Sequence, residues 1–547
     1  MVHDVFTLLL KELMKKRFSI AVVMIVFVAA LLLGVQISNV FSGDNIFDQL
    51  NKFKDVLSFT EKYYVDNVDS QKLVESAITG MLSDLDPHSV YIPASQLAKV
   101  NEEFQGSFEG IGVEYDVLND TIIVVSPVTG GPSEALGILA NDRIVRINDT
   151  SAIGIKRDDV PKKLRGPKGT HVRVSIFRPG EKNLFDFDIT RDKIPLYSVD
   201  ASFMVNDQVG YISMNRFSAT THDEFVAALD KLRQVGMKKL ILDLRNNPGG
   251  YLEQAERVAD ELLPKGRKIV YTQGRRQEFN EEYVSAGGRF TDIGLIVLIS
   301  HGSASASEIV SGAIQDWDRG LIVGETSFGK GLVQRQIELP DKSAFRLTIA
   351  RYYTPSGRLI QRPYGKDFDD YRKEPYTKNE SEGENIEHNE EKDSTRPVFK
   401  TSGGRKVFGG GGITPDYIVK EGRLTDYTVN LLGKNVFQEF VVGYLETHNK
   451  SLRDAYEKDM SRYLKDYTVT DDVIASFEEL AKKKGITVNR DQATTDMKYI
   501  KARLKADIAR TIWSNEGWYR VMRTEEDEQF GKALTLFPEA EKIAGLR

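Results

Sequence analysis

The sequence predicts a multidomain α/β protein, in which a β-rich module precedes an α/β core and helical regions flank both. Its 547 residues are too many for a single hydrophobic core. Short strands separated by Gly, Pro and Asn turns fill residues 105–192. Strands and helices then alternate from about residue 201 to 353, the pattern of a layered α/β core whose loops carry the chemistry.

The composition excludes several classes of function. The formal net charge of −6 shows no excess of basic residues, so no nucleic-acid partner is expected. The absence of cysteine excludes disulfides, thiolate metal sites and a cysteine nucleophile. The seven histidines include no pair at i, i+4 and no HExxH motif, so a zinc hydrolase is disfavoured and we expect neither metal nor cofactor.

Residues 1–43 are expected to form a cytoplasmic stub followed by a signal anchor or a cleaved signal peptide. Four basic residues at positions 11–17 precede an almost uninterrupted apolar run over 18–35, which is long enough to cross a bilayer. The basic flank predicts that the body of the protein is exported to the cell envelope, on the periplasmic or extracytoplasmic side. A buried core helix is the competing interpretation.

Residues 44–104 show apolar residues at helical spacing and predict packing helices. The β-rich module at 105–192 opens with FEGIGV at 108–113 and later contains LRGPKGT at 164–170; it resembles a PDZ domain of the kind found in bacterial proteases. Its glycine-containing loop, formed by Gly110, Ile111, Gly112 and Val113, is expected to offer backbone N–H groups to a peptide carboxylate, with the strand edge pairing with the peptide. The competing interpretation is a plain β-turn.

The α/β core is assigned to residues 193–365 and 407–422. The segment between them, 366–406, is acidic and poor in aliphatic residues, so a mobile insertion is predicted. Residues 423–547 are rich in Lys, Glu, Ala, Leu and aromatics at helical spacing and predict a helical C-terminal domain.

The candidate chemistry lies in GSASASEI at 302–309 and FGKGLVQ at 328–334. Small residues directly after the apolar segment 295–299 describe a strand that ends where a helix begins, which places a serine hydroxyl at a helix N-terminus. Lys330 could act as a general base for Ser305 if burial lowers its pKa, and Gln334 could hold the amine by a hydrogen bond. A Pro-Gly-Gly turn at 248–250 could aim the Gly249 or Gly250 amide at an oxyanion together with the amide of Ala306.

Two other interpretations of these segments remain open on the sequence alone. Residues 324–330 match the GxxxxGK of a phosphate-binding loop, but Gly331 stands where Ser or Thr should bind magnesium. His301 lies close to Ser305 in the sequence and is an alternative general base, although a residue just past a strand more often packs in a loop.

The order of the PDZ-like module, DLRNNPGG at 243–250, GSASASEI and FGKGLVQ resembles the carboxyl-terminal processing, or tail-specific, serine protease family, as do LDPHSVY at 85–91 and RYYTPSGRLIQ at 351–361. The resemblance implies a ClpP/crotonase-like core, Ser305 as nucleophile, Lys330 as base and Gln334 as its orienting partner. Ser303, Ser307 and Asp316 would then be structural.

The expected function is an ATP-independent serine endopeptidase of the cell envelope that recognises the exposed C-termini of proteins through its PDZ domain and cleaves those proteins with a Ser-Lys dyad. Further partners would be the membrane, if the N-terminal segment is retained, and a second copy or a regulatory adaptor. The alternative is a catalytically silent, membrane-anchored PDZ scaffold that binds protein tails.

Overall fold

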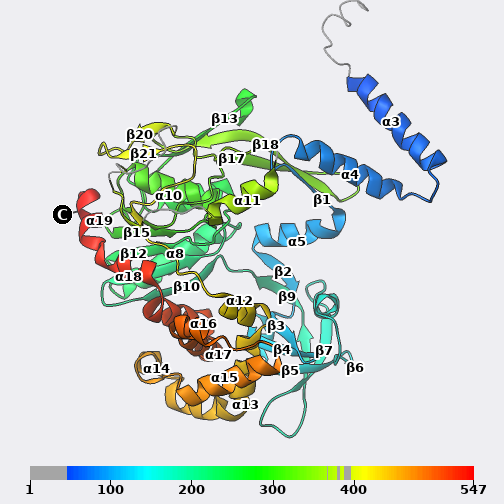
Figure 1. Ribbon diagram of the computed structural model, residues 1–547, viewed down its shortest axis with the longest axis vertical. Coiled ribbons are helices and arrows are strands. Elements are labelled where there is room, and N and C mark those ends of the chain that lie inside the picture. Colours follow the sequence, from blue (N-terminus) through cyan, green and yellow to red (C-terminus); the bar gives the residue numbers. More distant parts are fainter. Residues whose placement is uncertain (1–45, 366, 378–381, 387, 389–395, 547) are drawn as a thin grey trace, which may run out of the picture. The chain divides into compact units, whose positions relative to one another are not determined.

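The computed structural model describes residues 46–365, 367–377, 382–386, 388 and 396–546 (Figure 1). The N-terminal stub and apolar run predicted at 1–43 lie outside these residues. In the part of the chain that is described, no helix combines the length and the apolar character that a membrane crossing requires. The chain divides into two units, one ending at Asp84 and the other beginning at Leu85.

The first unit contains two helices, α3 (Ile46–Tyr63) and α4 (Ser70–Ser83). The Asp69 side chain caps α4 by accepting the Lys72 backbone N–H at 3.1 Å. None of the residues of α3 is buried, although the helix carries many large apolar side chains. The exposed large apolar residues of α3 are Ile46, Phe47, Leu50, Phe53, Val56, Phe59 and Tyr63.

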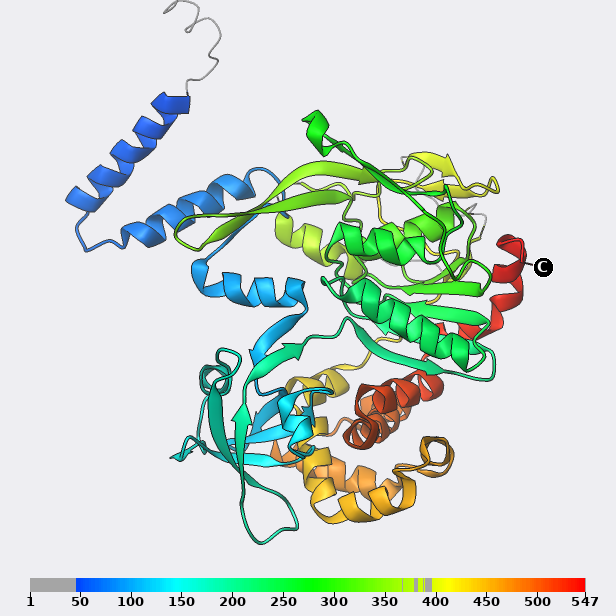
Figure 2. The same cartoon turned by 180° about the vertical axis from the view of Figure 1, so that it is seen from behind.

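The second unit begins with β1 (Val90–Ile92) and α5 (Ala94–Gln105), followed by the PDZ module. Two short strands, β2 (Ser107–Gly110) and β9 (Asp192–Pro195), pair antiparallel at the base of the module, and both views of the ribbon show them leading into it (Figures 1 and 2). Alternate residues of the strands point into one apolar cluster, as expected for half-buried strands. The six-stranded sheet runs β3 (Val113–Leu118), β4 (Thr121–Pro127), β5 (Arg143–Ile147), β7 (His171–Phe177) and β8 (Phe185–Thr190), with β6 (Thr150–Ser151) on β5; the helices are α6 (Pro132–Ala135), η1 (Arg157–Asp159) and α7 (Val160–Leu164).

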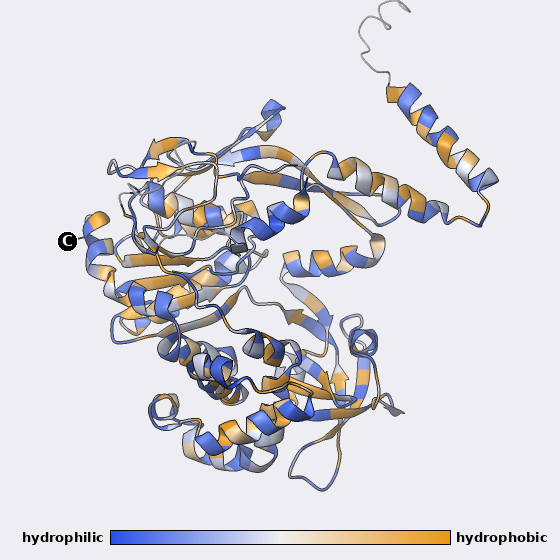
Figure 3. Ribbon diagram, in the orientation of Figure 1, coloured by the Kyte–Doolittle hydropathy of each residue, from blue (hydrophilic) through white to orange (hydrophobic). Residues whose placement is uncertain are grey.

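The α/β core is built on a seven-stranded sheet whose central strands are parallel and buried on both faces. In the ribbon coloured by hydropathy these strands are predominantly apolar, as parallel strands covered by helices should be (Figure 3). The strand order is β10 (Val199–Met204), β11 (Val209–Met214), β12 (Lys239–Asp243), β15 (Gly294–Ile299), β16 (Leu321–Gly324), β22 (Tyr417–Ile418) and β19 (Gly383–Glu384). The helices α8 (Thr221–Gln234), α9 (Leu252–Asp260) and α10 (Ala306–Asp316) cover one face.

The other face of the sheet is covered by the end of the chain. The helices α18 (Glu528–Thr535) and α19 (Phe537–Ile543) pack Phe530 and Phe537 against Ile241, Ile296 and Leu298 of the strands. The helical C-terminal domain predicted over 423–547 therefore also contributes its last two helices to the protease core. Helical spacing reveals an apolar face but not the surface that it covers.

A second, antiparallel sheet carries part of the candidate site. Its order is β1, β18 (Ala344–Tyr353), β13 (Lys268–Gly274) and β14 (Glu282–Val284), with β17 (Leu332–Glu338) paired to β18; η2 (Gln277–Phe279) follows β13. The remaining helices form an apolar cluster of their own. They are α12 (Asp426–Gly433), α13 (Val436–Tyr456), α14 (Met460–Asp466), α15 (Asp471–Lys483), α16 (Arg490–Thr495) and α17 (Met497–Glu525).

Part of the predicted mobile insertion is ordered. Residues 368–377 form α11 (Phe368–Thr377), and Tyr371 is buried between His88 and Phe328, with the Arg362 guanidinium 4.3 Å above its ring. Further on, β20 (Val398–Lys400) pairs with β21 (Lys406–Phe408). The prediction of a mobile segment rested on the scarcity of aliphatic residues, whereas aromatic and guanidinium contacts anchor this helix.

Candidate active site

Ser305 lies at the junction between β15 and α10. It is the N-cap of α10 and has φ 54° and ψ −111°, an unusual backbone conformation for a residue with a side chain. Such strain persists only where the surroundings hold it, and it often marks a functional position. Two contacts hold it here: the backbone N–H donates to the Glu308 carboxylate at 2.8 Å, and Tyr352 Oη donates to the Ser305 carbonyl oxygen at 3.0 Å.

Glu308 joins the serine to the lysine loop. Its carboxylate is fully buried and accepts four hydrogen bonds, from the Ser305, Gly329 and Lys330 backbone N–H groups and from Ser327 Oγ. The distances lie between 2.5 and 2.9 Å. Burial raises the pKa of the Glu308 carboxyl, while these donors favour the charged form. One side chain therefore fixes both halves of the proposed dyad.

The surroundings of Lys330 make its ammonium group lose a proton more readily than an exposed lysine does. Burial lowers its pKa to about 8, and the nearby positive charge of Arg346 acts in the same direction. Its Nζ donates to Gln334 Oε1 at 2.9 Å. At mildly alkaline pH a substantial fraction of Lys330 is therefore the neutral amine that a general base requires.

Gln334 is oriented from its other side by the loop at 85–91. Its Nε2 donates to the His88 carbonyl oxygen, which leaves Oε1 facing the lysine. The loop itself is fixed by Asp86, whose carboxylate accepts the backbone N–H groups of His88 and Ser89 at 2.8 and 2.9 Å. Burial, together with the charge of Lys330, lowers the pKa of His88 to about 4, so His88 is neutral at physiological pH.

Five of the proposed site residues line one large cavity of about 1070 Å³. Ser305, Lys330 and Gln334 line it together with Gly249 and Gly250. Among the hydrogen bonds of the described residues there is none between Ser305 Oγ and Lys330 Nζ. The proposed nucleophile Ser305 and the proposed base Lys330 therefore line the same cavity, and the lysine amine is hydrogen-bonded to Gln334.

The two glycines after DLRNNP differ in their availability as donors. The Gly249 N–H already donates to Asn247 Oδ1 at 2.9 Å, so an oxyanion would have to compete for it. Gly249 has φ +96°, and a Cβ there would come within 2.9 Å of the Ala306 nitrogen. We therefore infer that Gly249, which has no side chain, leaves room beside the Ala306 N–H. We take the Gly250 N–H as the second donor to the oxyanion.

The alternative interpretations of the sequence are disfavoured by local contacts. His301 Nδ1 lies 2.8 Å from the Thr326 carbonyl oxygen, within hydrogen-bond distance, and His301 is not among the residues that line the cavity. In the GxxxxGK loop, the Gly329 and Lys330 N–H groups that a phosphate would need are donated to Glu308. The contacts of this loop therefore position Lys330 and disfavour the binding of a nucleotide phosphate.

The three residues predicted to be structural, Ser303, Ser307 and Asp316, are all buried and make polar contacts. Ser303 Oγ donates to the Leu244 carbonyl oxygen and Ser307 Oγ to the Asn247 carbonyl oxygen, at 2.8 and 2.9 Å. Asp316 is buried in an ion pair with Arg358 at 2.7 Å. The two serine contacts tie the start of α10 to the loop that carries the two glycines, whereas Asp316 lies at the other end of this helix.

The predicted carboxylate loop connects β2 with β3. Gly110 ends β2, Val113 begins β3, Ile111 is buried and Gly112 has φ +74°. The Ile111 carbonyl oxygen accepts Ser133 Oγ at 2.6 Å, which fixes the loop against α6. The strand that follows, β3, lies at the edge of its sheet, so its outer edge is available for pairing.

Sequence reasoning missed the roles of Glu308 and Tyr352. The sequence does indicate a helix-capping position for Glu308, because a Glu three residues after a Ser at a helix start is a capping-box pattern. The hydrogen bonds of Glu308 to the lysine loop could not be predicted from the sequence, because they join segments about twenty residues apart. Tyr352 gave no signal, since an aromatic residue in a strand is ordinary core.

Comparisons with known proteins agree with this architecture. The model of peptidase family S41 matches residues 208–369, and that of a PDZ domain matches 123–178. The Activating protease CtpB N-terminal domain matches residues 35–95, and a family of unknown function matches 427–514.

Among similar proteins, a carboxy-terminal-processing protease of Bartonella bacilliformis is 40% identical over 61% of this chain and 77% of its own length. The carboxy-terminal processing protease CtpA of Bacillus subtilis is 37% identical over 61% of this chain and 72% of its own length. A solved structure, a photosystem II D1 C-terminal processing protease, is 30% identical, covers 56% of this chain and 89% of its own, and has a TM-score of 0.32.

Fold and matches together define a serine-type peptidase with a PDZ domain. The chain belongs to peptidase family S41, as a carboxy-terminal processing protease.

Proposed function

We propose that this protease cleaves protein substrates with a Ser305–Lys330 dyad, without ATP, after its PDZ domain has bound their C-terminal tails. The observation that carries the proposal is a lysine of lowered pKa, held by a glutamine, in the same cavity as a strained serine at a helix N-terminus. A silent scaffold would need none of these features, and membership of a peptidase family counts against it.

The chemistry follows from the positions of the groups. The neutral Lys330 amine takes the proton from Ser305 Oγ, and the oxygen attacks the peptide carbonyl carbon. The N–H groups of Ala306 and Gly250 stabilise the oxyanion, with the N-terminus of α10 adding its dipole. Protonated Lys330 then gives its proton to the leaving amine, and water, deprotonated by the lysine, releases the acyl group from the serine.

The proposed location is the cell envelope, with the protease on the periplasmic or extracytoplasmic side. Its support is the basic and then apolar character of residues 11–35. For partners beyond substrates, a homodimer or a regulatory adaptor stays a prediction, and the exposed apolar side chains of α3 are the surface on which we expect such a partner to bind.

Tail recognition is tested by removing the substrate's terminal charge. With an unfolded protein substrate that ends in apolar residues, we expect cleavage without ATP, and about tenfold slower cleavage when the terminal carboxylate is converted to an amide. The reason is the loss of charge-assisted hydrogen bonds to the loop at Gly110–Val113. The measurement is kcat/KM by gel or mass spectrometry.

In the control substrate, the side chain of an internal glutamate is converted to an amide and the C-terminal carboxylate stays free. Equal rates for the free and amidated tails would contradict tail recognition and leave only the peptidase activity.

A further inference from the structure

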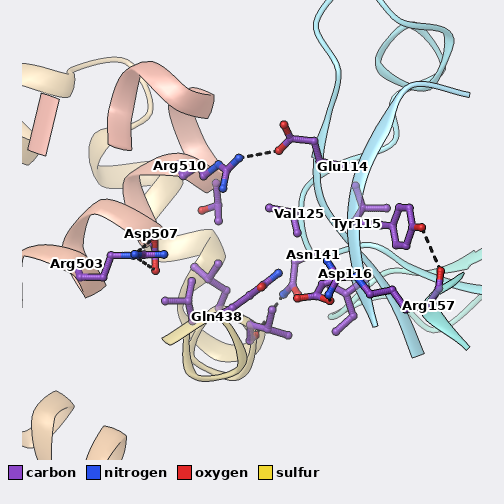
Figure 4. Close-up of a pocket in the computed structure, with 16 residues that line it drawn as sticks. Glu114, Tyr115, Asp116, Val125, Asn141, Arg157, Gln438, Arg503, Asp507 and Arg510 are labelled. Atoms are coloured by element: carbon purple, nitrogen blue, oxygen red, sulfur yellow. Dashed lines mark hydrogen bonds and ion pairs between the residues drawn. The ribbon is translucent and has the colours of Figure 1, made fainter. Parts of the chain in front are cut away.

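A second cavity, of about 260 Å³, lies between the PDZ sheet and the C-terminal helices (Figure 4). One wall is the face of β3 and β4, and the other is formed by α13 and α17. The strand side contributes Glu114, Tyr115, Asp116, Ile123, Val124, Val125, Asn141 and Arg157; the helix side contributes Gln438, Val441, Val442, Leu445, Arg503, Asp507, Arg510 and Thr511.

The cavity extends to the strand that is expected to pair with a substrate tail. Along β3, Val113, Tyr115 and Val117 pack toward the core of the PDZ module, so Glu114 and Asp116 face the opposite side. Tyr115 nevertheless lines the cavity, which places the cavity beside the β3 backbone as well as beside its outward side chains. Arg157, which begins η1, also lines it and pairs with Asp116 at 2.5 Å.

A peptide that adds to the edge of β3 must direct its side chains alternately to the two faces of the sheet. An apolar last side chain should point toward the apolar core of the PDZ module. The side chains of the second and fourth residues from the carboxyl end then point to the other face of the sheet, toward α13 and α17. Those side chains would enter the cavity, which the helical domain closes.

The charges of the cavity are already balanced. Each arginine is paired with a carboxylate: Arg157 with Asp116, Arg503 with Asp507 at 2.9 Å and Arg510 with Glu114 at 2.8 Å. A further charged side chain would be desolvated there without a free partner. The cavity therefore favours an uncharged occupant.

Two buried polar atoms of the lining have no hydrogen-bond partner among the described residues: Asn141 Oδ1, an acceptor, and Arg510 Nε, a donor. The side chain of Asn141 spans toward α13, since its Nδ2 donates to the Val442 carbonyl oxygen at 3.4 Å. Asn141 is only 7% exposed. A carboxamide carries both an N–H and a C=O, so its N–H can donate to Asn141 Oδ1 or its C=O can accept from Arg510 Nε.

We propose that this cavity is a specificity subsite of the tail-binding groove, formed jointly by the PDZ sheet and the helical domain, and that it takes an asparagine or glutamine side chain at the second or fourth residue from the substrate's carboxyl end. The proposal rests on the tail recognition proposed above.

The test measures binding of fluorescent ten-residue peptides to the Ser305→Ala chain, which holds tails without cutting them. Peptides with an apolar last residue carry Gln, Leu or Glu at the second or fourth position from the end. We expect Gln to bind about three to ten times more tightly than Leu or Glu, the worth of one or two hydrogen bonds. The same exchanges at the third position should show no preference for Gln.

Asn141→Gly should abolish that preference for Gln. Glycine keeps the left-handed backbone of this position, φ +71°, and removes only the side chain. Arg510→Lys, which keeps a positive charge opposite Glu114 and removes Nε, should reduce the preference independently. The matched control is Arg173→Ala, on an exposed ion pair of the same sheet outside the cavity.

The outcomes separate the two proposals. Tails that bind without a preference for Gln, or a preference that survives in both Asn141→Gly and Arg510→Lys, overturn the subsite and leave tail recognition standing. Failure of every free-carboxylate peptide to bind better than its amidated form overturns tail recognition itself.

Discussion

Replacing Ser305 by alanine, Lys330 by methionine, or both should lower kcat about 10⁴-fold or more, and the double variant should be no worse than either single one. The two side chains form one proton-transfer unit, so the loss of either removes the whole of its contribution. Methionine fills the volume of the lysine stem without an amine. Single-turnover cleavage of an unfolded substrate measures the effect.

Measurements of thermal unfolding and of tail binding show whether these variants are folded normally. Each should unfold at a temperature close to that of the parent and bind tails as before, because neither residue lies in the PDZ module. Lys231→Met, an exposed lysine of α8, is the matched control and should keep full activity. A Lys330→Met chain that retained even a tenth of the parent's kcat would contradict the assignment of the base.

Glu308→Gln should lower kcat about 100-fold with little change in KM. Two donors face each carboxylate oxygen, Ser327 Oγ and the Gly329 N–H on one and the Ser305 and Lys330 N–H groups on the other. A glutamine NH₂ in either orientation would oppose at least one backbone N–H and leave it unsatisfied. The start of α10 and the lysine loop would then lose their shared anchor.

The pH dependence distinguishes positioning from a general loss of fold. The negative charge of Glu308 raises the pKa of Lys330, so its removal should lower that pKa and move the rise of kcat/KM to lower pH. A variant that is merely unstable would lose activity without such a shift. The control is Glu181→Gln, an exposed residue of the PDZ module, for which neither kcat nor the profile should change.

The sequence predicted much of the site because its parts are local patterns. A strand followed by small residues and a helix predicts the junction at Ser305, and the structure places the N-cap of α10 there. Apolar and glycine neighbours predict that Lys330 is shielded from solvent; in the structure the residue is half-buried, and burial lowers its pKa to about 8. Its role as base, like that of Gln334, stays a prediction for the experiments above.

What the sequence could not predict depends on contacts between distant segments. Nothing local indicates that Asn247 occupies the Gly249 N–H, or that His88 orients Gln334 from 246 residues away. Likewise, α18 and α19 read as ordinary amphipathic helices, and only the tertiary fold shows that they cover the protease sheet. The order of α11 depends on aromatic and arginine packing that composition does not reveal.

The most direct test of the account is the pH profile of kcat/KM for the parent chain on a peptide that lacks titratable groups between pH 6 and 10. The account predicts a rise with pH that follows a single ionisation with a pKa of about 8, as Lys330 loses its proton and becomes the base. A midpoint above 10, or a profile unchanged in Glu308→Gln, would contradict it, because the lysine would then be an ordinary solvated cation.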